Sequence, residues 1–439
     1  MLAYYLRLGL RSLRRNPILT TLMVLAIGVG VAASMTTYAV FRAVSANPIP
    51  GKSGQLFVPR IDLWGPTARA QGRRLPDMLS YSDAMALMRA HRAVNQAAIY
   101  PVGFTVIPPD ASVNPFAVKG DATYAEFFPM FDVPFAYGSG WGASEDEAHG
   151  AVVVISSRLN QQLFGGADSV GRMIRLDDHD YRIVGVLANW NPQPRFYDVN
   201  VYSRTFSGAP DFFVPFTHAV DLQTDTNGNS SCYGSAGRAP GWQGWLQSDC
   251  VWASLWVQLP DAAAARAYRS FLKGYAAEQK NAGRFDWLPE VQLVGFRQWM
   301  DVEEVVPPET RMSLFLSIGF LLVCLINTVG LLLAKFMRRS AEIGVRRALG
   351  ASRADIIRQF LAESVMVGLA GGVAGLLFTG IGVLAIGLVF EPDIARLAHM
   401  NLSLMVLTIL LSLAASMTAA FYPTWRAAHV QPAWQLKSN

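Results

Sequence analysis

The chain has 439 residues, of which 52% are hydrophobic and only 16% charged, and its formal net charge is +5. Soluble proteins carry about 25% charged residues, so this composition argues against a wholly soluble protein. So small a net charge gives no reason to expect a nucleic-acid partner. The longest apolar runs lie near the two ends of the chain, with a mixed segment between them.

Four long uncharged runs predict four membrane-spanning helices. We place them at residues 17–44, 311–334, 364–390 and 400–425. A bilayer core needs about 20 consecutive apolar residues in helical form, and helices buried in soluble proteins seldom reach that length. The first run exceeds the roughly 7–15 residues of a secretory signal core, so we expect it to remain as an anchor in the lipid bilayer.

The basic residues predict which side of the membrane each segment faces. The segments before the first run, between the second and third, and after the fourth carry 13 basic and 3 acidic residues. Lys and Arg remain preferentially in the cytoplasm. We therefore expect both termini to be cytoplasmic and residues 45–310 to lie outside.

Residues 45–310 predict a large mixed α/β domain between the first and second membrane helices. Strand and helix patterns alternate at its two ends, so residues 54–120 and 250–300 are expected to form one α/β unit. One of the expected strands covers residues 112–119. Residues 121–215 have the pattern of a β-rich insertion into this unit.

Within the insertion, the polar segment 177–180 separates two short apolar runs, 173–176 and 181–186, which predicts a hairpin. Three aspartates and one histidine in this turn raise the question of a metal site. Adjacent turn residues cannot all point at one ion, so we expect no metal there.

Residues 222–250 predict a long loop rich in Gly, Ser, Asn and Trp. Cys232 and Cys250 both lie in it, while Cys324 lies in the second membrane run. An oxidising compartment permits a disulfide, which we expect between Cys232 and Cys250, with two unpaired thiols as the alternative. The tryptophans in and beyond this loop either contact a partner or lipid or pack on the domain, and the sequence does not decide between these.

The chain carries no recognised catalytic motif. The segment GKS at 51–53 resembles the end of a phosphate-binding loop, but Ala46 stands where that loop requires glycine. HExxH and GxSxG are absent. We expect this chain to be no enzyme and to bind no metal or cofactor itself. The interiors of the membrane runs also lack Asp, Glu, Lys and Arg, which argues against a transporter coupled to an ion gradient.

Residues 335–363 predict a basic cytoplasmic extension. The second membrane helix is expected to continue to Leu349 and to stop at Gly350. Ser352 and Asp355 resemble a capping box that starts a new short helix, which we expect to lie along the membrane and to offer one face to a partner. A basic loop that only fixes topology or binds anionic lipid remains an equal alternative.

Several stretches resemble the FtsX/MacB-type permease family of ABC transporters. The most specific is EIGVRRALGAS at 342–352, followed by QFLAE at 359–363. LRSLRRNP at 10–17 is similar to the family's amphipathic entry helix, here residues 1–16. YPTWRAA at 422–428, followed by QP at 431–432, is similar to the family's C-terminal end and runs into the expected cytoplasmic tail at 426–439. The core-domain matches are YAEFF 124–128, VVVIS 152–156, LFG 163–165, VGR 170–172 and YRIVGV 181–186.

This resemblance implies a type VII, mechanotransmission ABC system in a bacterial inner membrane, with the α/β unit and its insertion as Porter-like and Sabre-like subdomains in the periplasm. Two permease subunits, identical or related, would pair above an ABC ATPase dimer that binds ATP and Mg, and a periplasmic adaptor and an outer-membrane channel are further expected partners. We expect the ATPase to be a separate polypeptide. The resemblance places its docking interface at Glu342, Arg346, Arg347, Gly350, Ala351, Ser352, Arg353, Asp355, Ile356, Arg358 and Gln359.

The favoured function is a permease subunit of an exporter or extraction machine, which converts ATP hydrolysis into motion of the periplasmic domain. The alternative is a regulator of a cell-wall hydrolase, like FtsX itself. The loop at 222–250 departs from the family pattern.

The third membrane run is rich in glycine. Gly368/Gly372 and Gly371/Gly375 form two GxxxG spacings, which allow helices to approach closely. The alternative is the general enrichment of glycine in membrane helices.

Overall fold

The computed structural model describes residues 16–108, 114–199, 206, 208–233, 240–389 and 400–428. The chain divides into two compact units. We call Met1–Ser45 with Val306–Asn439 the membrane unit, and Ala46–Val305 the α/β domain. The expected entry helix and most of the C-terminal tail lie outside the described residues.

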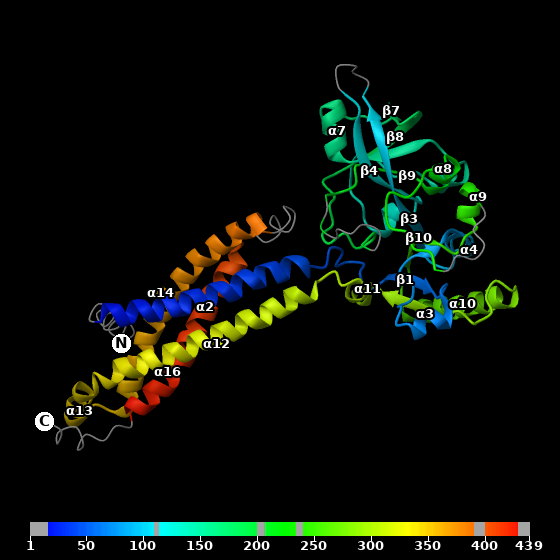
Figure 1. The fold of residues 1–439 in the computed structure, drawn as a ribbon. Coiled ribbons are helices and arrows are strands. Elements are labelled where there is room, and N and C mark those ends of the chain that lie inside the picture. The colour runs from blue at the N-terminus through cyan, green and yellow to red at the C-terminus, as the bar shows by residue number, and fades with distance from the viewer. Residues whose placement is uncertain are drawn as a thin grey trace. The chain divides into compact units, whose positions relative to one another are not determined.

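Among the residues that the structure describes, the membrane unit contains four helices that are long and apolar enough to cross a membrane. They lie side by side as a bundle in which α14 packs against α2 and α16, and α12 packs against the same two helices (Figure 1). A further short helix, α13, joins α12 to α14. The bounds are α2 Pro17–Val44, α12 Pro308–Met337, α13 Ser340–Ala348, α14 Arg353–Val389 and α16 Leu402–Ala428.

The bundle buries one stripe of each helix and exposes another. Met23, Ile27 and Val31 on α2 are fully buried. By contrast, α12 exposes Phe315 and Leu316, at 73% and 72%. Since a spanning helix satisfies its own backbone hydrogen bonds, exposed apolar side chains of this kind are compatible with lipid. The prediction of four membrane-crossing helices is confirmed.

The structure corrects the predicted helices after the second membrane run at two places. The expected continuous helix to Leu349 is broken after Met337, and α13 starts at Ser340. The expected short helix after Ser352 and the third membrane helix are one helix, α14. Neither glycine nor proline interrupts Arg353–Val367, so nothing in the sequence ends the helix there.

The α/β domain is built on an 11-stranded sheet, whose strands run in the order β11-β1-β10-β3-β4-β9-β6-β8-β5. Two strands lie off this path, β2 beside β10 and β7 beside β3 and β8. The bounds are β1 Leu56–Ile61, β2 Leu79–Ser80, β3 Asn95–Ile107, β4 Phe116–Thr123, β5 Phe135–Gly138, β6 Val152–Ile155, β7 Met173–Leu176, β8 His179–Leu187, β9 Phe212–Pro215, β10 Val251–Gln258 and β11 Val291–Gly295.

Nine helices are described in this domain. They are α3 Gly65–Ala70, α4 Tyr81–Ala90, α5 Phe127–Met130, α6 Ala143–Glu147, α7 Ser157–Phe164, α8 Phe216–Asp221, α9 Gly241–Leu246, α10 Ala262–Asn281 and α11 Phe296–Val302. The mixed α/β fold predicted between the first and second membrane helices is confirmed.

Strand β3 joins the two predicted parts of the domain into one sheet. Its first half, Asn95 to Ile99, pairs with β10, and its second half, Tyr100 to Val106, pairs with β4. Its end, Val106 and Ile107, also pairs with β7, which lies in the predicted β-rich part. One strand therefore serves both the α/β unit and the β-rich part. The strand expected at 112–119 is observed at Phe116–Thr123, and residues 112 and 113 lie outside the described part of the chain.

The predicted hairpin is present with a shorter turn than expected. Leu176 pairs directly with His179, which leaves only Asp177 and Asp178 in the turn. Asp177 has a φ of +49°, as two-residue hairpin turns require. His179 and Asp180 are therefore part of strand β8 rather than of the turn.

Candidate functional site

The chain reverses direction between α13 and α14, and we call α13 with the first two turns of α14, residues 340–360, the coupling hairpin. Gly350 makes the reversal with a φ of +101°, a conformation that L side chains rarely adopt. The N–H of Gly350 donates to the Arg347 carbonyl at 3.2 Å, and that of Ala351 to the Arg346 carbonyl at 3.1 Å. These bonds close α13 as a helix C-terminal motif.

Ser352 and Asp355 form the reciprocal capping box that the sequence predicts. The Ser352 hydroxyl accepts from the Asp355 N–H at 3.2 Å and donates to Asp355 Oδ2 at 2.6 Å. The Ser352 N–H donates to the same carboxylate at 3.3 Å. The start of α14 is thereby fixed directly after the turn.

Arg346 ties the two arms of the hairpin together. Its Nη1 donates to Gln359 Oε1 on α14 at 2.9 Å, and its Nη2 pairs with Glu342 on α13 at 2.7 Å. Arg358 lies on an exposed face and is 3.8 Å from Asp355. The structure thus brings most of the predicted interface residues onto one compact element.

The tip of the hairpin, residues 348–354, is exposed apart from the half-buried Ala351. Leu349 is 83% exposed and Arg353 is also exposed. Val345 is 53% exposed on the neighbouring turn of α13. An apolar side chain so exposed on a surface rich in arginine is typical of a protein interface.

The root of the hairpin is buried in the membrane unit. Ile343, Ile356 and Phe360 are only 6%, 3% and 3% exposed. The rings of Phe360 and Phe336 lie 4.0 Å apart between centroids, which joins α14 to the end of α12. Ile356 was expected at the docking interface and is instead part of this core, because the apolar face of the hairpin packs on its own bundle.

A buried ionic cluster lies next to the root and was not among the predicted site residues. Lys335 on α12 and Glu363 on α14 have side chains that are 0% and 3% exposed, and their charged atoms are 3.3 Å apart. Arg339 Nη1, from the break between α12 and α13, is 3.0 Å from Glu363 Oε1. A single carboxylate therefore receives two cations from the segment that precedes the hairpin. Burying such charges is tolerable only when they are paired.

The signal for this cluster is present in the sequence but is easily missed. Glu363 is the last charge before a long apolar run, and Lys335 is the first after another. When the two runs are considered separately, each charge marks only the end of an apolar run. Only the continuity of α14 reveals that the two charges face each other.

The glycines of α14 face two different helices of the same chain. A Cβ at Gly371 would lie 2.9 Å from Ile27 on α2, and one at Gly375 would lie 3.4 Å from Val31 on α2. A Cβ at Gly368 would lie 3.0 Å from Ser416 Cβ on α16, and one at Gly372 would lie 2.9 Å from Ile409 on α16. The two GxxxG faces therefore allow close packing within one chain.

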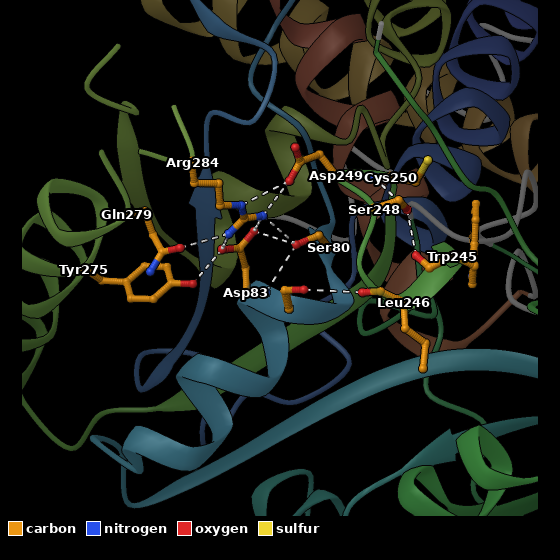
Figure 2. A network of polar contacts seen from close by, with 11 residues as sticks. Ser80, Asp83, Trp245, Leu246, Ser248, Asp249, Cys250, Tyr275, Gln279 and Arg284 are labelled. Atoms are coloured by element: carbon orange, nitrogen blue, oxygen red, sulfur yellow. Dashed lines mark hydrogen bonds and ion pairs between the residues drawn. The ribbon is translucent and has the colours of Figure 1, made fainter. Parts of the chain in front are cut away.

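In the α/β domain, Cys232 and Cys250 are joined in a disulfide, and Cys324 is a buried free thiol. Figure 2 shows the polar network beside this bridge. Arg284 is bidentate to Asp83, at 2.6 and 2.9 Å, and its Nη2 also contacts Asp249 at 2.7 Å. The loop that ends at Cys250 is thereby attached to α4 by charge-assisted bonds.

The tryptophans near the loop pack on the domain. Trp252 and Trp256 are 0% and 1% exposed, and Trp242 and Trp245 are half-buried against the core. The packing alternative is therefore the one observed.

A second buried cluster lies on β4. Arg195 is 3.6 Å from Asp121 and also pairs with Asp198. Burial raises the pKa of Asp198 to about 6 against the opposing effect of Arg195. Burial, with the neighbouring Asp198 charge, raises the pKa of Asp121 well above its ordinary value. One guanidinium thus faces two carboxyl groups in a site withdrawn from water. This arrangement favours retention of a proton by the pair of carboxyls.

Two family models cover most of the chain. The model described as MacB-like periplasmic core domain matches residues 20–273, and the model described as FtsX-like permease C-terminal matches residues 314–432. The second match contains the whole coupling hairpin, the Lys335–Glu363 pair and the glycines of α14.

Curated relatives agree with these models. The pyoverdine export ATP-binding/permease protein PvdT of Pseudomonas aeruginosa is 25% identical over 72% of this chain and 41% of its own length. The macrolide export ATP-binding/permease protein MacB of Bordetella avium is 26% identical over 97% of this chain and 59% of its own length. The chain thus spans about two-fifths to three-fifths of the length of these relatives.

Among solved structures, the periplasmic region of MacB from Actinobacillus actinomycetemcomitans superposes with a TM-score of 0.36 at 11% identity, over 60% of this chain and 98% of that one. That likeness is too loose to carry an argument. The two family models, which together extend from the first membrane helix to the end of the last, decide the assignment. The chain belongs to the FtsX/MacB-type family of ABC transporter permeases.

Proposed function

We propose that this chain is the permease subunit of an exporter or extraction machine, driven by an ABC ATPase on a separate polypeptide that docks at the tip of the coupling hairpin. The observation that carries the proposal is the contrast within the hairpin. Its tip exposes Leu349 at 83%, while its root at Ile356 and Phe360 is only 3% exposed. A partner that moves the tip therefore moves packed core residues.

The contacts at the root define a route for that movement. The hairpin is continuous with α14, and Glu363 on α14 is paired with Lys335 on α12 and with Arg339 just beyond it. The Phe336–Phe360 contact links the same two helices. Because α12 follows the α/β domain directly in the chain, a displacement of its inner end acts on the connection to that domain.

In this proposal the chain has no catalytic residue of its own, and ATP and Mg bind to the partner ATPase dimer. Two permease subunits, identical or related, form the membrane part in a bacterial inner membrane, with both termini in the cytoplasm and the α/β domain in the periplasm. The names of the relatives, which refer to pyoverdine and macrolide export, support export. A hydrophobic, peptide or lipoprotein-like substrate fits this class, as do a periplasmic adaptor and an outer-membrane channel.

The test is ATP hydrolysis by the complex that the full chain forms in its native membrane. We expect tagged wild-type chain to co-purify with an ATP-hydrolysing polypeptide, and Leu349→Asp to lose most of that activity because a charge replaces the apolar contact. Leu288→Asp, an equal change at a 56% exposed leucine of the α/β domain, is the matched control. Equal ATPase recovery with both variants would exclude the tip as the docking site.

A further inference from the structure

A pocket of 440 Å³ in the α/β domain is lined in part by residues of the segment 222–250, which departs from the family pattern. Three helical elements form it: the start of α4, the end of α8 with the nearby Gln223, and α9 with the following Gln247. The residues that line it include Tyr81, Gln223, Trp242, Gln243 and Gln247. We call it the glutamine pocket.

Three glutamine side chains supply uncharged polar groups to the glutamine pocket. The side-chain amides of Gln223, Gln243 and Gln247 make no hydrogen bond to any residue that the structure describes, and all three residues are exposed. Each amide offers two donors and an acceptor oxygen. The charged residue of the pocket, Asp221, is already bonded to His149 Nδ1. The chemistry therefore favours a neutral ligand that both donates and accepts hydrogen bonds.

Aromatic rings supply the apolar part of the pocket. Trp242 is half-buried, and Tyr81 stacks on the fully buried Trp252 with an interplanar angle of 5°. Trp245, about one turn along α9 from Trp242, also stacks on Trp252, with an interplanar angle of 23°, and both α9 tryptophans pack against the domain core. Both aromatic walls are thus held by the domain core rather than by solvent-exposed segments.

The wall that carries Trp242 and two of the glutamines is fixed covalently. Helix α9 lies between Cys232 and Cys250, which are joined in a disulfide. The Ser82 hydroxyl on α4 donates to the Leu246 carbonyl at the end of α9 at 3.3 Å. Such a preformed wall lowers the entropy that a ligand must lose on binding.

We propose that the glutamine pocket binds a neutral sugar, of the kind found in uncharged glycans. A pyranose ring presents an apolar C–H face, which suits an indole, and a rim of hydroxyls that donate and accept, which suits three amides. A volume of 440 Å³ is that of a small-ligand site. A peptide is less suited, because extended peptides bind along an open strand edge and helix ends line this pocket.

The experiment uses the full chain in lipid nanodiscs, since detergents with sugar headgroups would compete. Di-N-acetylchitobiose, a neutral disaccharide, is titrated while tryptophan fluorescence or heat is recorded. We expect saturable binding by the wild type and about a tenfold weaker affinity for Gln243→Ala/Gln247→Ala, which removes two amides. Gln161→Ala/Gln162→Ala, an exposed pair on α7, is the matched control and should bind like the wild type.

A tryptophan variant, melting temperatures and a peptide titration distinguish sugar binding from loss of folding and from peptide binding. Trp242→Leu should weaken binding by a similar factor, and unchanged melting temperatures would show that each variant is folded. Absence of saturable disaccharide binding by the wild type overturns the proposal, as does binding that survives both the glutamine and the tryptophan variants. A different result is that the wild type binds tetra-alanine but no sugar, and that the peptide binding is lost in the same variants. That result would assign the pocket to peptides and would also overturn the proposal.

Discussion

Lys335 Nζ lies 3.3 Å from Glu363 Oε2, and both side chains are almost completely withdrawn from solvent. The pair joins the C-terminal end of α12 to the N-terminal third of α14 beside the coupling hairpin. We predict that Glu363→Gln destabilises the membrane unit by about 3 kcal/mol, because a buried lysine is left without its countercharge. Unfolding of the full chain in a mild detergent, followed by circular dichroism, measures this change.

The double variant Lys335→Met/Glu363→Met separates stability from coupling. It removes the buried charges together, so we expect most of the stability to return. Arg339, whose side chain is 12% exposed, can turn its guanidinium towards water. If the double variant also supports wild-type ATPase coupling, the cluster has no part in transmission and serves only to hold the helices.

The sequence predicts the membrane helices well because their apolar length is set by the bilayer. The first uncharged run coincides with α2, and Pro17 stands at its first turn. The Lys335–Glu363 pair could not be predicted in this way. Each charge, seen alone, ends an apolar run, and only the unbroken α14 brings Glu363 towards α12.

Gly368 permits α14 to approach α16, where the Ser412 hydroxyl donates to the Gly368 carbonyl at 2.7 Å. We predict that Gly368→Val destabilises the bundle by roughly 1–3 kcal/mol, because its side chain would overlap Ser416 and the backbone of Leu413. Gly330→Ala on α12 is the control, since a Cβ there meets nothing within 4 Å. Equal unfolding midpoints for the two variants would contradict tight packing at this crossing.

The Cys232–Cys250 bridge closes a loop with a sequence separation of 18. Cys232→Ser/Cys250→Ser should lower the free energy of unfolding of the α/β domain by about 3 kcal/mol in the chain-entropy model. Differential scanning fluorimetry of the full chain reports the change. A reducing agent should lower the melting temperature of the wild type to a similar extent as the double serine substitution does. Cys324→Ala should not respond to reductant differently from the wild type. An unchanged melting temperature after reduction would show that the bridge contributes nothing.

The buried Asp121–Arg195–Asp198 cluster predicts a pH dependence. The two carboxyls titrate near pH 4 in the unfolded chain, whereas burial raises the pKa of Asp198 to about 6 and that of Asp121 well above its ordinary value. The folded domain therefore keeps protons that the unfolded chain has lost. Its stability is fully present below about pH 4 and falls as the pH rises through about 6 and beyond.

Asp121→Asn should reduce this slope and stabilise the domain at about pH 8 by roughly 1–3 kcal/mol, because it removes a buried carboxyl that burial and the neighbouring Asp198 disfavour in its charged form. Asp178→Asn makes the same charge change at a side chain that is 92% exposed, and should keep the wild-type slope. Urea unfolding at about pH 5 and about pH 8 gives the comparison. A wild-type domain equally stable at both values would contradict the inferred proton uptake.

Part of the candidate site follows from local sequence and part does not. Gly350 and the Ser352–Asp355 box act within a few residues of each other, so their motif specifies their geometry. Ile356 was misplaced for the opposite reason. An apolar face on a short helix looks the same whether it meets a partner or its own bundle, and only the fold shows Ile356 in the core.

An ATPase that docks at the tip of the coupling hairpin must lie within reach of residue 349, and a photo-cross-linking amino acid at this position detects that contact. Leu349 is 83% exposed, so the replacement should leave the bundle intact. We predict that light yields an adduct between the full chain and a polypeptide that is labelled by azido-ATP. The same probe at position 288 should give none. An adduct at 349 with lipid alone, or modification of this position from the periplasmic side, would contradict the account.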